Sequence, residues 1–316
     1  MIRFIINRIL VSILIVFLIS VFVFSLMHIL PGDPARLALG EDASQEDVDE
    51  LRRELNLDKP LLNQYVIWIG GIIKGDFGNS IAYDRPVSDI ILERLPRTIS
   101  IGIPAIIISS IFGICFGVIS ALKRGKWIDQ IITVFATLGV GAPQFWVGIL
   151  GIYFFALKLR ILPIQGWVSP ADSFGQYVYK AILPVICLSL HMIASIARQT
   201  RSNMLDVINQ DYIRTVRANG IAERSVVFRH ALKNALIPII TIIGLQVRVI
   251  IGGSLMVEQV FTIAGIGLLM RTSVQSRDYL IVQACVLIIS AFTVSVNLLV
   301  DILYGIINPR IRESWR

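Results

Sequence analysis

Charged side chains are scarce in this sequence. They make up 16% of the 316 residues, whereas hydrophobic residues make up 55%, and the mean hydropathy is +0.74. A soluble domain carries about 25% charged residues, so the composition excludes an ordinary soluble globule and also a disordered chain. The net charge of +7 alone would suit a nucleic-acid-binding protein. Its distribution along the chain, described below, indicates a membrane instead and no nucleic-acid partner.

Cysteines and catalytic motifs are scarce as well. The three cysteines lie in apolar stretches without a CxxC pair, which excludes a disulfide scaffold and favours packing roles. The sequence contains no GxxxxGK[S/T] phosphate loop, no GxSxG motif and no HExxH motif, and its three histidines lack metal-ligand spacing. We therefore expect no catalytic residue, metal or cofactor in this chain. If ATP drives the protein, ATP and Mg²⁺ are bound by another chain.

Long apolar runs are what the sequence has in abundance. About 20 residues of helix cross a 30 Å hydrocarbon core, and six windows reach that length or come close to it. They are Ile9–Leu30, Ile99–Leu122, Ile131–Leu157, Ala181–Ala197, Leu236–Val257 and Leu280–Tyr304. The fourth window is the weakest, because it is short and contains Pro184, Ser189 and His191. The expected fold is an all-α polytopic membrane protein with six transmembrane helices.

The distribution of Lys and Arg predicts the orientation of these helices. With the N-terminus in the cytoplasm, the inside segments hold fifteen basic residues, and the two short outside loops (158–180 and 258–279) hold five. By the positive-inside rule, both termini are expected in the cytoplasm. The chain then divides into residues 1–30 (N-terminus and first helix), 31–98 (outside), 99–310 (transmembrane core) and 311–316 (cytoplasmic tail). The core includes a cytoplasmic loop, residues 198–237.

The outside segment 31–98 is expected to be folded. Ser44 followed by Asp47 is typical of a helix N-terminus, and Val48, Leu51 and Leu55 continue at helical spacing up to Pro60. A second amphipathic stretch contains Tyr65, Trp68 and Ile72, and the glycines of Gly75–Gly78 mark a turn.

The loop 198–237 is predicted to form two short helices, Asp206–Arg217 and Ala222–Ala235, joined at Gly220. Asn219-Gly220 is a strong turn dipeptide, because both residues tolerate positive φ. Basic and apolar residues alternate along both helices. Such a pair can rest its apolar face on a partner while its arginines meet carboxylates or lipid phosphates. A solvated basic loop beside anionic lipid explains the charge equally well.

The order of residues in this loop resembles a known motif. Asp211–Gly220 (DYIRTVRANG) and Arg229–Pro238 (RHALKNALIP) resemble the "EAA" loop of ABC importer permeases, in the form found in dipeptide, oligopeptide, glutathione and nickel importers. Further similarities to that family follow in order along the chain: LPGDP (30–34), LDKP (57–60), GDFGNS (75–80), RDY (277–279) and NPR (308–310). Arg214-Thr215-Val216 stands where many permeases have Glu-Ala-Ala. A salt bridge of the motif glutamate therefore cannot be transferred to this chain.

The resemblance implies a type I ABC importer permease in a bacterial inner membrane. It also implies the partners: a second homologous permease, two ATPase subunits and an extracytoplasmic solute-binding protein, together with membrane lipid. The loop would dock into the ATPase and carry its motion to the helices. The residues expected to serve this coupling are Arg214, Arg217, Ala218, Asn219, Gly220 and Glu223.

Polar residues within the apolar windows are candidates for the translocation path. Arg248 lies in the middle of the fifth window, where a charge costs at least about 2.5–3.5 kcal/mol. It either attracts a substrate carboxylate or pairs with an acid within the protein. Gln246, Ser254 and Asn297 could line the same path or form interhelical hydrogen bonds. Gly113 and Gly117, at GxxxG spacing, are expected to allow close helix packing.

Two other classes of protein and several substrates stay open. A secondary transporter usually shows inverted repeats and broken helices in both halves, and we find neither in the sequence. A membrane-embedded enzyme needs paired acids, histidines or a nucleophile at one membrane depth, and the apolar windows show none. Within the ABC family, dipeptides, oligopeptides and glutathione are favoured as substrates, with nickel as the alternative.

Overall fold

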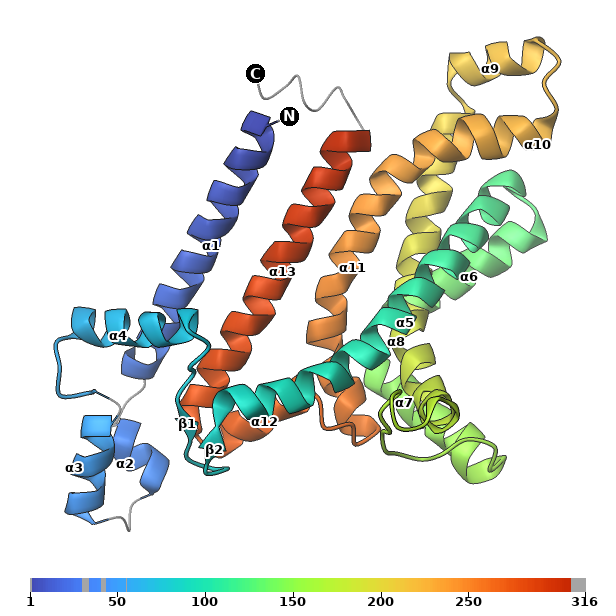
Figure 1. Cartoon of the computed structure of the whole chain (residues 1–316). Helices are drawn as coiled ribbons and strands as arrows, with labels where there is room; N and C mark the ends of the chain where they lie inside the picture. Colours follow the sequence, from blue (N-terminus) through green and yellow to red (C-terminus); the bar gives the residue numbers. More distant parts are fainter. Residues whose placement is uncertain (1, 30–33, 41–43, 55, 308–316) are drawn as a thin grey trace. The chain divides into compact units, whose positions relative to one another are not determined.

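The computed structural model describes residues 2–29, 34–40, 44–54 and 56–307 (Figure 1). For a few residues inside helices, Arg248 among them, only the backbone is described. The described elements are α1 (Ile2–Ile29), α2 (Pro34–Leu39), α3 (Gln45–Glu54), α4 (Leu61–Ile73), β1 (Asn79–Ser80), β2 (Arg85–Pro86), α5 (Val87–Leu122), α6 (Trp127–Gly141), α7 (Gln144–Gly151), the π-helical η1 (Ile152–Lys158), α8 (Phe174–Ile208), α9 (Asp211–Ala218), α10 (Glu223–Ser225), the π-helical η2 (Val226–Ala231), α11 (Leu232–Val260), α12 (Ile266–Gln275) and α13 (Tyr279–Ile307). The described part of the chain is mostly helical, as predicted, and includes one small antiparallel hairpin, β1–β2.

Among the described residues, four helices are long and apolar enough to cross a membrane unbroken: α1, α5, α8 and α13. Two bent helix pairs also qualify, so the described residues provide up to six spans. The window Ile131–Leu157 is not the single straight helix that the sequence suggested, because α6 and α7–η1 meet at an angle of 105°. Pro143 explains the bend: proline has no N–H and holds the preceding residue in an extended conformation. Ala142 is extended accordingly, with φ −75° and ψ 129°.

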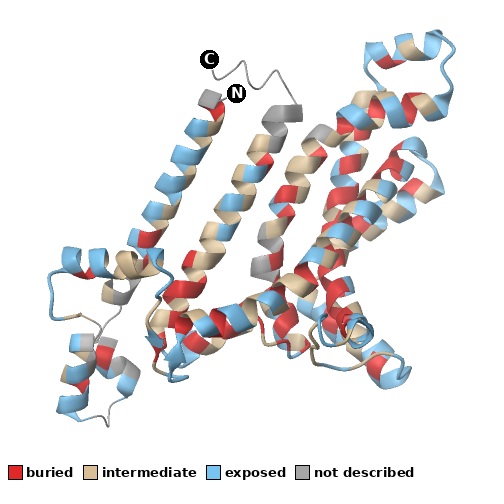
Figure 2. Cartoon of the chain, viewed as in Figure 1, coloured by how far each residue is buried: buried red, intermediate tan, exposed pale blue. Residues whose placement is uncertain are grey.

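The window that seemed weakest in the sequence is part of a 35-residue helix, α8. Of its most apolar stretch, 67% is buried, against 11% for α1, and Figure 2 shows the exposed residues along α1. Burial explains how α8 accommodates polar residues. Ser189 is 1% exposed, and its hydroxyl donates to the Val185 carbonyl one turn earlier, at 2.6 Å.

The chain forms two compact units. One unit comprises residues 99–263 with residues 1–5 and 296–316. Its core joins α5, α8 and α11 through Ile101, Leu188, Met192 and other buried residues. A Cβ at Gly113 would lie 2.7 Å from the Ile196 side chain, so α5 and α8 pack closely there, which confirms the predicted role of this glycine.

The second unit comprises residues 6–98 and 264–295. The predicted helix start at Ser44 is confirmed, because the Asp47 N–H donates to the Ser44 hydroxyl oxygen at 3.2 Å and α3 begins at Gln45. Leu55, expected at the end of that helix, lies outside the described residues. The second amphipathic stretch is also confirmed as α4, and the rings of Tyr65 and Trp68 both lie against Phe24 of α1.

Asp278 links two motifs of this unit that are almost 200 residues apart. Its buried carboxylate accepts hydrogen bonds from the Ser80 hydroxyl at 2.6 Å and from the Ala82 N–H at 3.2 Å. It also accepts the Ile281 N–H at 3.3 Å, at the start of α13. The GDFGNS segment and the RDY segment are therefore held together by hydrogen bonds to the Asp278 carboxylate.

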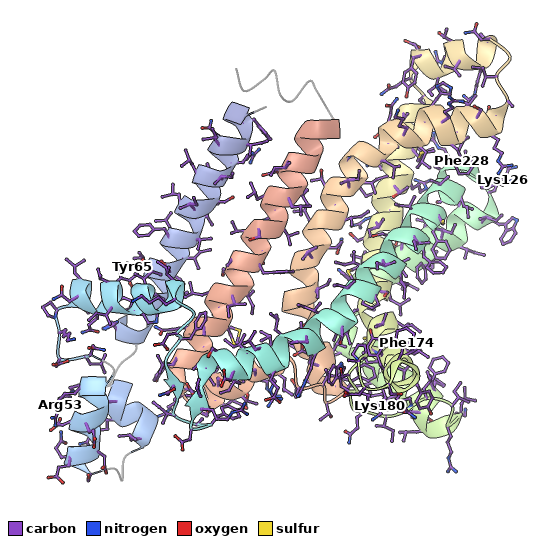
Figure 3. All side chains as sticks on the ribbon, viewed as in Figure 1. Arg53, Tyr65, Lys126, Phe174, Lys180 and Phe228 are labelled. Carbon is purple, nitrogen blue, oxygen red and sulfur yellow. The ribbon has the colours of Figure 1, made fainter. Side chains whose placement is uncertain are left out.

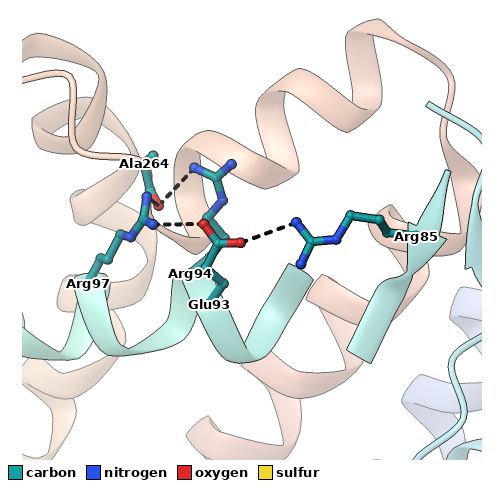
Figure 4. Close-up of polar contacts among 5 residues, drawn as sticks. All are labelled: Arg85, Glu93, Arg94, Arg97 and Ala264. Atoms are coloured by element: carbon teal, nitrogen blue, oxygen red, sulfur yellow. Dashed lines mark hydrogen bonds and ion pairs between the residues drawn. The ribbon is translucent and has the colours of Figure 1, made fainter. Parts of the chain in front are cut away.

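The start of α5 is fixed to the segment before α12 by arginines (Figure 4). Arg94 and Arg97 both donate to the Ala264 carbonyl oxygen, at 3.3 and 3.4 Å. Arg97 also pairs with Glu93 at 2.8 Å, and Glu93 accepts from Arg85 at 3.5 Å. These contacts stabilise the second unit at a point where α5 leaves the small hairpin.

Candidate functional site

The loop 198–237 is built from three elements: the end of α8, the short helix α9 and the helix that begins at α10. The sequence placed the first loop helix at Asp206–Arg217, but residues 206–208 belong to α8, and α9 begins at Asp211. The helix is interrupted at Asn209 and Gln210, because Gln210 adopts an extended conformation with ψ 150°. The second predicted helix is confirmed, apart from its first residue, Ala222. It starts at Glu223, contains the π-helical turn η2 and runs directly into α11.

Gly220 makes the turn between the two loop helices. Its φ is +72°, in the left-handed region that glycine adopts without steric cost. Its N–H donates to the Arg217 carbonyl oxygen at 3.0 Å, which closes the end of α9. A Cβ placed on Gly220 would meet no neighbouring atom within 4 Å. Glycine is therefore favoured here by the backbone conformation and not by a lack of space. In Figure 1, α9 and the helix beginning at α10 run side by side from this turn.

An ion pair bridges the turn. Arg217 Nη2 and Nε lie 2.7 and 3.1 Å from the two carboxylate oxygens of Glu223, a bidentate arrangement. The two residues lie in the loop, outside the apolar segments. Hydrogen bonding from Arg217 lowers the pKa of the Glu223 carboxyl below its ordinary value. The sequence named both residues as coupling candidates without indicating that they pair. The pair links the end of α9 to the start of α10 across the turn.

The underside of the loop is apolar and buried. Ile213 of α9 and Val226 of η2 are both completely buried, and Val227 is nearly so. They pack in one cluster with Val118 of α5 and Met204 of α8. This close packing joins the loop to the ends of α5, α8 and α11 beneath it.

The outer face of the loop is exposed. All six residues predicted to serve coupling (Arg214, Arg217, Ala218, Asn219, Gly220 and Glu223) are exposed. Phe228, which the sequence analysis did not single out, is 56% exposed and is labelled in Figure 3. Together with Ala222, Arg224 and Ser225 it lines a shallow hollow of about 490 Å³. An exposed aromatic ring among arginines is the signal that could have identified it, because such residues anchor protein interfaces.

The described side chains among the candidates for the translocation path are buried or half-buried, unlike the exposed loop residues. Gln246 is 7% exposed, and its amide donates to the Ser195 hydroxyl at 3.1 Å, which is an interhelical hydrogen bond. Ser254 is completely buried, and Asn297 of α13 is half-buried. The side chain of Arg248 lies outside the described residues. A transport role for these four residues stays a prediction.

Comparison with known proteins identifies the family. Residues 113–313 match the family described as binding-protein-dependent transport system inner membrane component, and residues 1–102 match the N-terminal region of such membrane components. The chain belongs to this family. It is therefore a multi-pass component of the bacterial inner membrane and a permease of the ABC importer type. The resemblance found in the sequence is confirmed.

Full-length relatives support the same assignment. A probable peptide ABC transporter permease of Sinorhizobium fredii is 39% identical over 98% of this chain and 99% of its own length. The glutathione transport system permease of Escherichia coli K12 is 41% identical over 99% of both chains. A putative peptide transport system permease of Brucella abortus is 41% identical over 98% of both. Permeases of this family work with a binding protein and an ATPase, so this permease is a transport component and not itself the catalyst.

Proposed function

We propose that this permease imports short peptides, including glutathione, and that ATPase subunits drive it through the loop 198–237. The observation that carries the substrate class is the similarity, over nearly the whole chain, to permeases named for peptide and glutathione transport. Coupling is supported by the two faces of the loop: its apolar face packs on the transmembrane helices, and its polar face, with the six coupling candidates, is exposed. ATP is bound together with Mg²⁺ and hydrolysed on the partner subunits.

The proposed arrangement has six spans with both ends in the cytoplasm, each bent pair counting as one span. A second homologous permease completes the path, and an extracytoplasmic binding protein delivers the peptide. Closure of the ATPases moves the Gly220 turn, with Phe228 and the exposed arginines as contact points. Because the loop packs on α5, α8 and α11 through one apolar cluster, its displacement moves these helices as a rigid body. The peptide then passes into the cell.

An uptake assay tests this proposal. The permease is reconstituted in liposomes with its co-purified partners and binding protein, and labelled dipeptide, glutathione and Ni²⁺ are offered separately. We expect peptide uptake that requires hydrolysable ATP and the binding protein. Uptake driven by a proton gradient without ATP would contradict the proposal in favour of a secondary transporter. Uptake of Ni²⁺ alone would contradict the substrate class but leave the coupling intact.

A further inference from the structure

A second polar cluster lies near the loop, within the same unit, and none of its members was singled out by the sequence. Its centre is Asp129, in the first turn of α6, which is only 5% exposed. Arg201 of α8 donates to both carboxylate oxygens, from Nε at 2.7 Å and from Nη2 at 2.9 Å. The hydroxyl of Ser120, near the end of α5, and the backbone N–H of Gly125 at 3.0 Å complete the set. One carboxylate thus ties together α5, α6 and α8.

The position of Arg201 connects this cluster to the loop. Arg201 lies about two helical turns before the end of α8, and one turn after it Met204 packs in the same apolar cluster as Ile213 of α9. The neighbouring residue, Thr200, contacts α5 so closely that a Cβ on Gly117 would lie 2.4 Å from its Cβ. The end of α8 is therefore fixed on one side to α9 and on the other to α5 and α6.

Stability alone explains the ion pair poorly. The Asp129 carboxylate is almost completely removed from water, whereas 31% of the Arg201 side chain stays exposed, and apolar residues of similar volume often stabilise a protein as well as a buried ion pair or better. What a bidentate pair supplies is direction, because the planar guanidinium fixes both the distance and the angle to the carboxylate. Fixed geometry is what a joint between moving helices requires.

We infer that Asp129 and Arg201 are positioning residues of the transport cycle. They transmit the displacement of the loop from α8 to α6, beside the apolar cluster that joins the loop to α5, α8 and α11, so that ATP hydrolysis also moves α6. This inference rests on the proposed coupling function, and it goes further by naming the joint. Without the pair, the loop still docks on the ATPase and carries α5, α8 and α11 with it, but α6 no longer follows their motion.

The test uses the reconstituted complex and the double variant Asp129→Asn/Arg201→Gln. Removing both charges leaves neither one buried without a partner, so the variant is expected to fold and assemble where either single variant can fail. Three quantities are measured: the yield of assembled complex, ATP hydrolysis without binding protein, and peptide taken up per ATP hydrolysed. Lys126→Gln is the matched control, because it removes one exposed charge directly before α6 (Figure 3) and leaves Asp129 and Arg201 unchanged.

We expect the double variant to assemble and hydrolyse ATP as the wild type does, while uptake per ATP falls about tenfold or more, within the range of coupling between distant sites. Arg201→Lys, which keeps the charge but loses the fork, should give an intermediate value. The inference is overturned if the double variant keeps the wild-type uptake per ATP, or if uptake falls only in proportion to assembled complex. If the wild-type complex itself shows no ATP-dependent uptake, the proposed function has failed instead.

Discussion

Substitution of Gly220 tests the coupling turn most sharply, because the structure separates backbone from side-chain effects there. The residue has a φ of +72°, and a Cβ would meet nothing within 4 Å. Any cost of Gly220→Ala is therefore conformational. Holding an L-residue in the left-handed region costs about 1–2 kcal/mol, which corresponds to a factor of about 5–30 in an equilibrium. Asparagine tolerates this region better than alanine.

Proline is the extreme member of the series. Its ring fixes φ near −65°, which is incompatible with the observed turn, and it removes the N–H that donates to the Arg217 carbonyl. The ion pair between Arg217 and Glu223 spans the same turn and should be lost with it. We therefore expect the coupling strength to fall in the order Gly, Asn, Ala, Pro.

The assay is the ATPase concentration that half-saturates binding-protein-stimulated hydrolysis in the reconstituted complex. Gly220→Asn should stay close to wild type, Gly220→Ala should need up to about 5–30 times more ATPase, and Gly220→Pro should show no stimulation. The reasoning is refuted if alanine and proline both behave as wild type. It is also refuted if asparagine is as damaging as proline, because the turn would then be limited by side-chain space.

Two predictions concern stability, and thermal unfolding of the purified permease checks both. Gly117→Ala should destabilise the permease by about 1–3 kcal/mol through overpacking, because its Cβ would lie 2.4 Å from Thr200 Cβ and 2.7 Å from the Ala197 carbonyl oxygen. The control Gly70→Ala, with open space around it, should be neutral or stabilise by up to about 1 kcal/mol. Equal effects of the two substitutions would contradict the predicted helix contact. Asp278→Ala should cost about 1–3 kcal/mol of stability, because it leaves the buried Ser80 hydroxyl without its acceptor. A thermal unfolding midpoint equal to that of the exposed control Asp58→Ala would show that the GDFGNS and RDY segments do not depend on each other.

The sequence predicted where the apolar helices lie, because apolar length is a local property; among the described residues, four of them are unbroken candidate spans, and the bent pairs raise the number to at most six. It missed the bend at Ala142 and Pro143, although the proline alone indicated that the preceding residue leaves the helix. The sequence also suggested that the apolar window within α8 is the weakest span, because it contains polar residues. A helix buried by other helices needs no continuous apolar surface, and Ser189 satisfies its own hydroxyl within the helix.

The candidate site could be predicted in part. The exposed loop residues and the turn at Gly220 follow from composition and turn propensity. The bond between Arg217 and Glu223 depends on the direction of the chain after that turn, which no local pattern specifies. The pair formed by Asp129 and Arg201 joins residues 72 positions apart, so only the folded structure reveals it.

Cysteine cross-linking from an exposed position on η2 in the loop tests the central claim most directly. Phe228→Cys and the control Leu62→Cys, both at exposed positions (56% and 79%), are introduced after the exposed Cys115 is replaced by serine. The account predicts that Cys at 228 cross-links to the co-purified ATPase, and that an impermeant thiol reagent reaches it only after the cells are opened. Cys at 62 should react from outside and form no such cross-link. Labelling of position 228 from outside, or a cross-link to the ATPase only from position 62, would contradict the account.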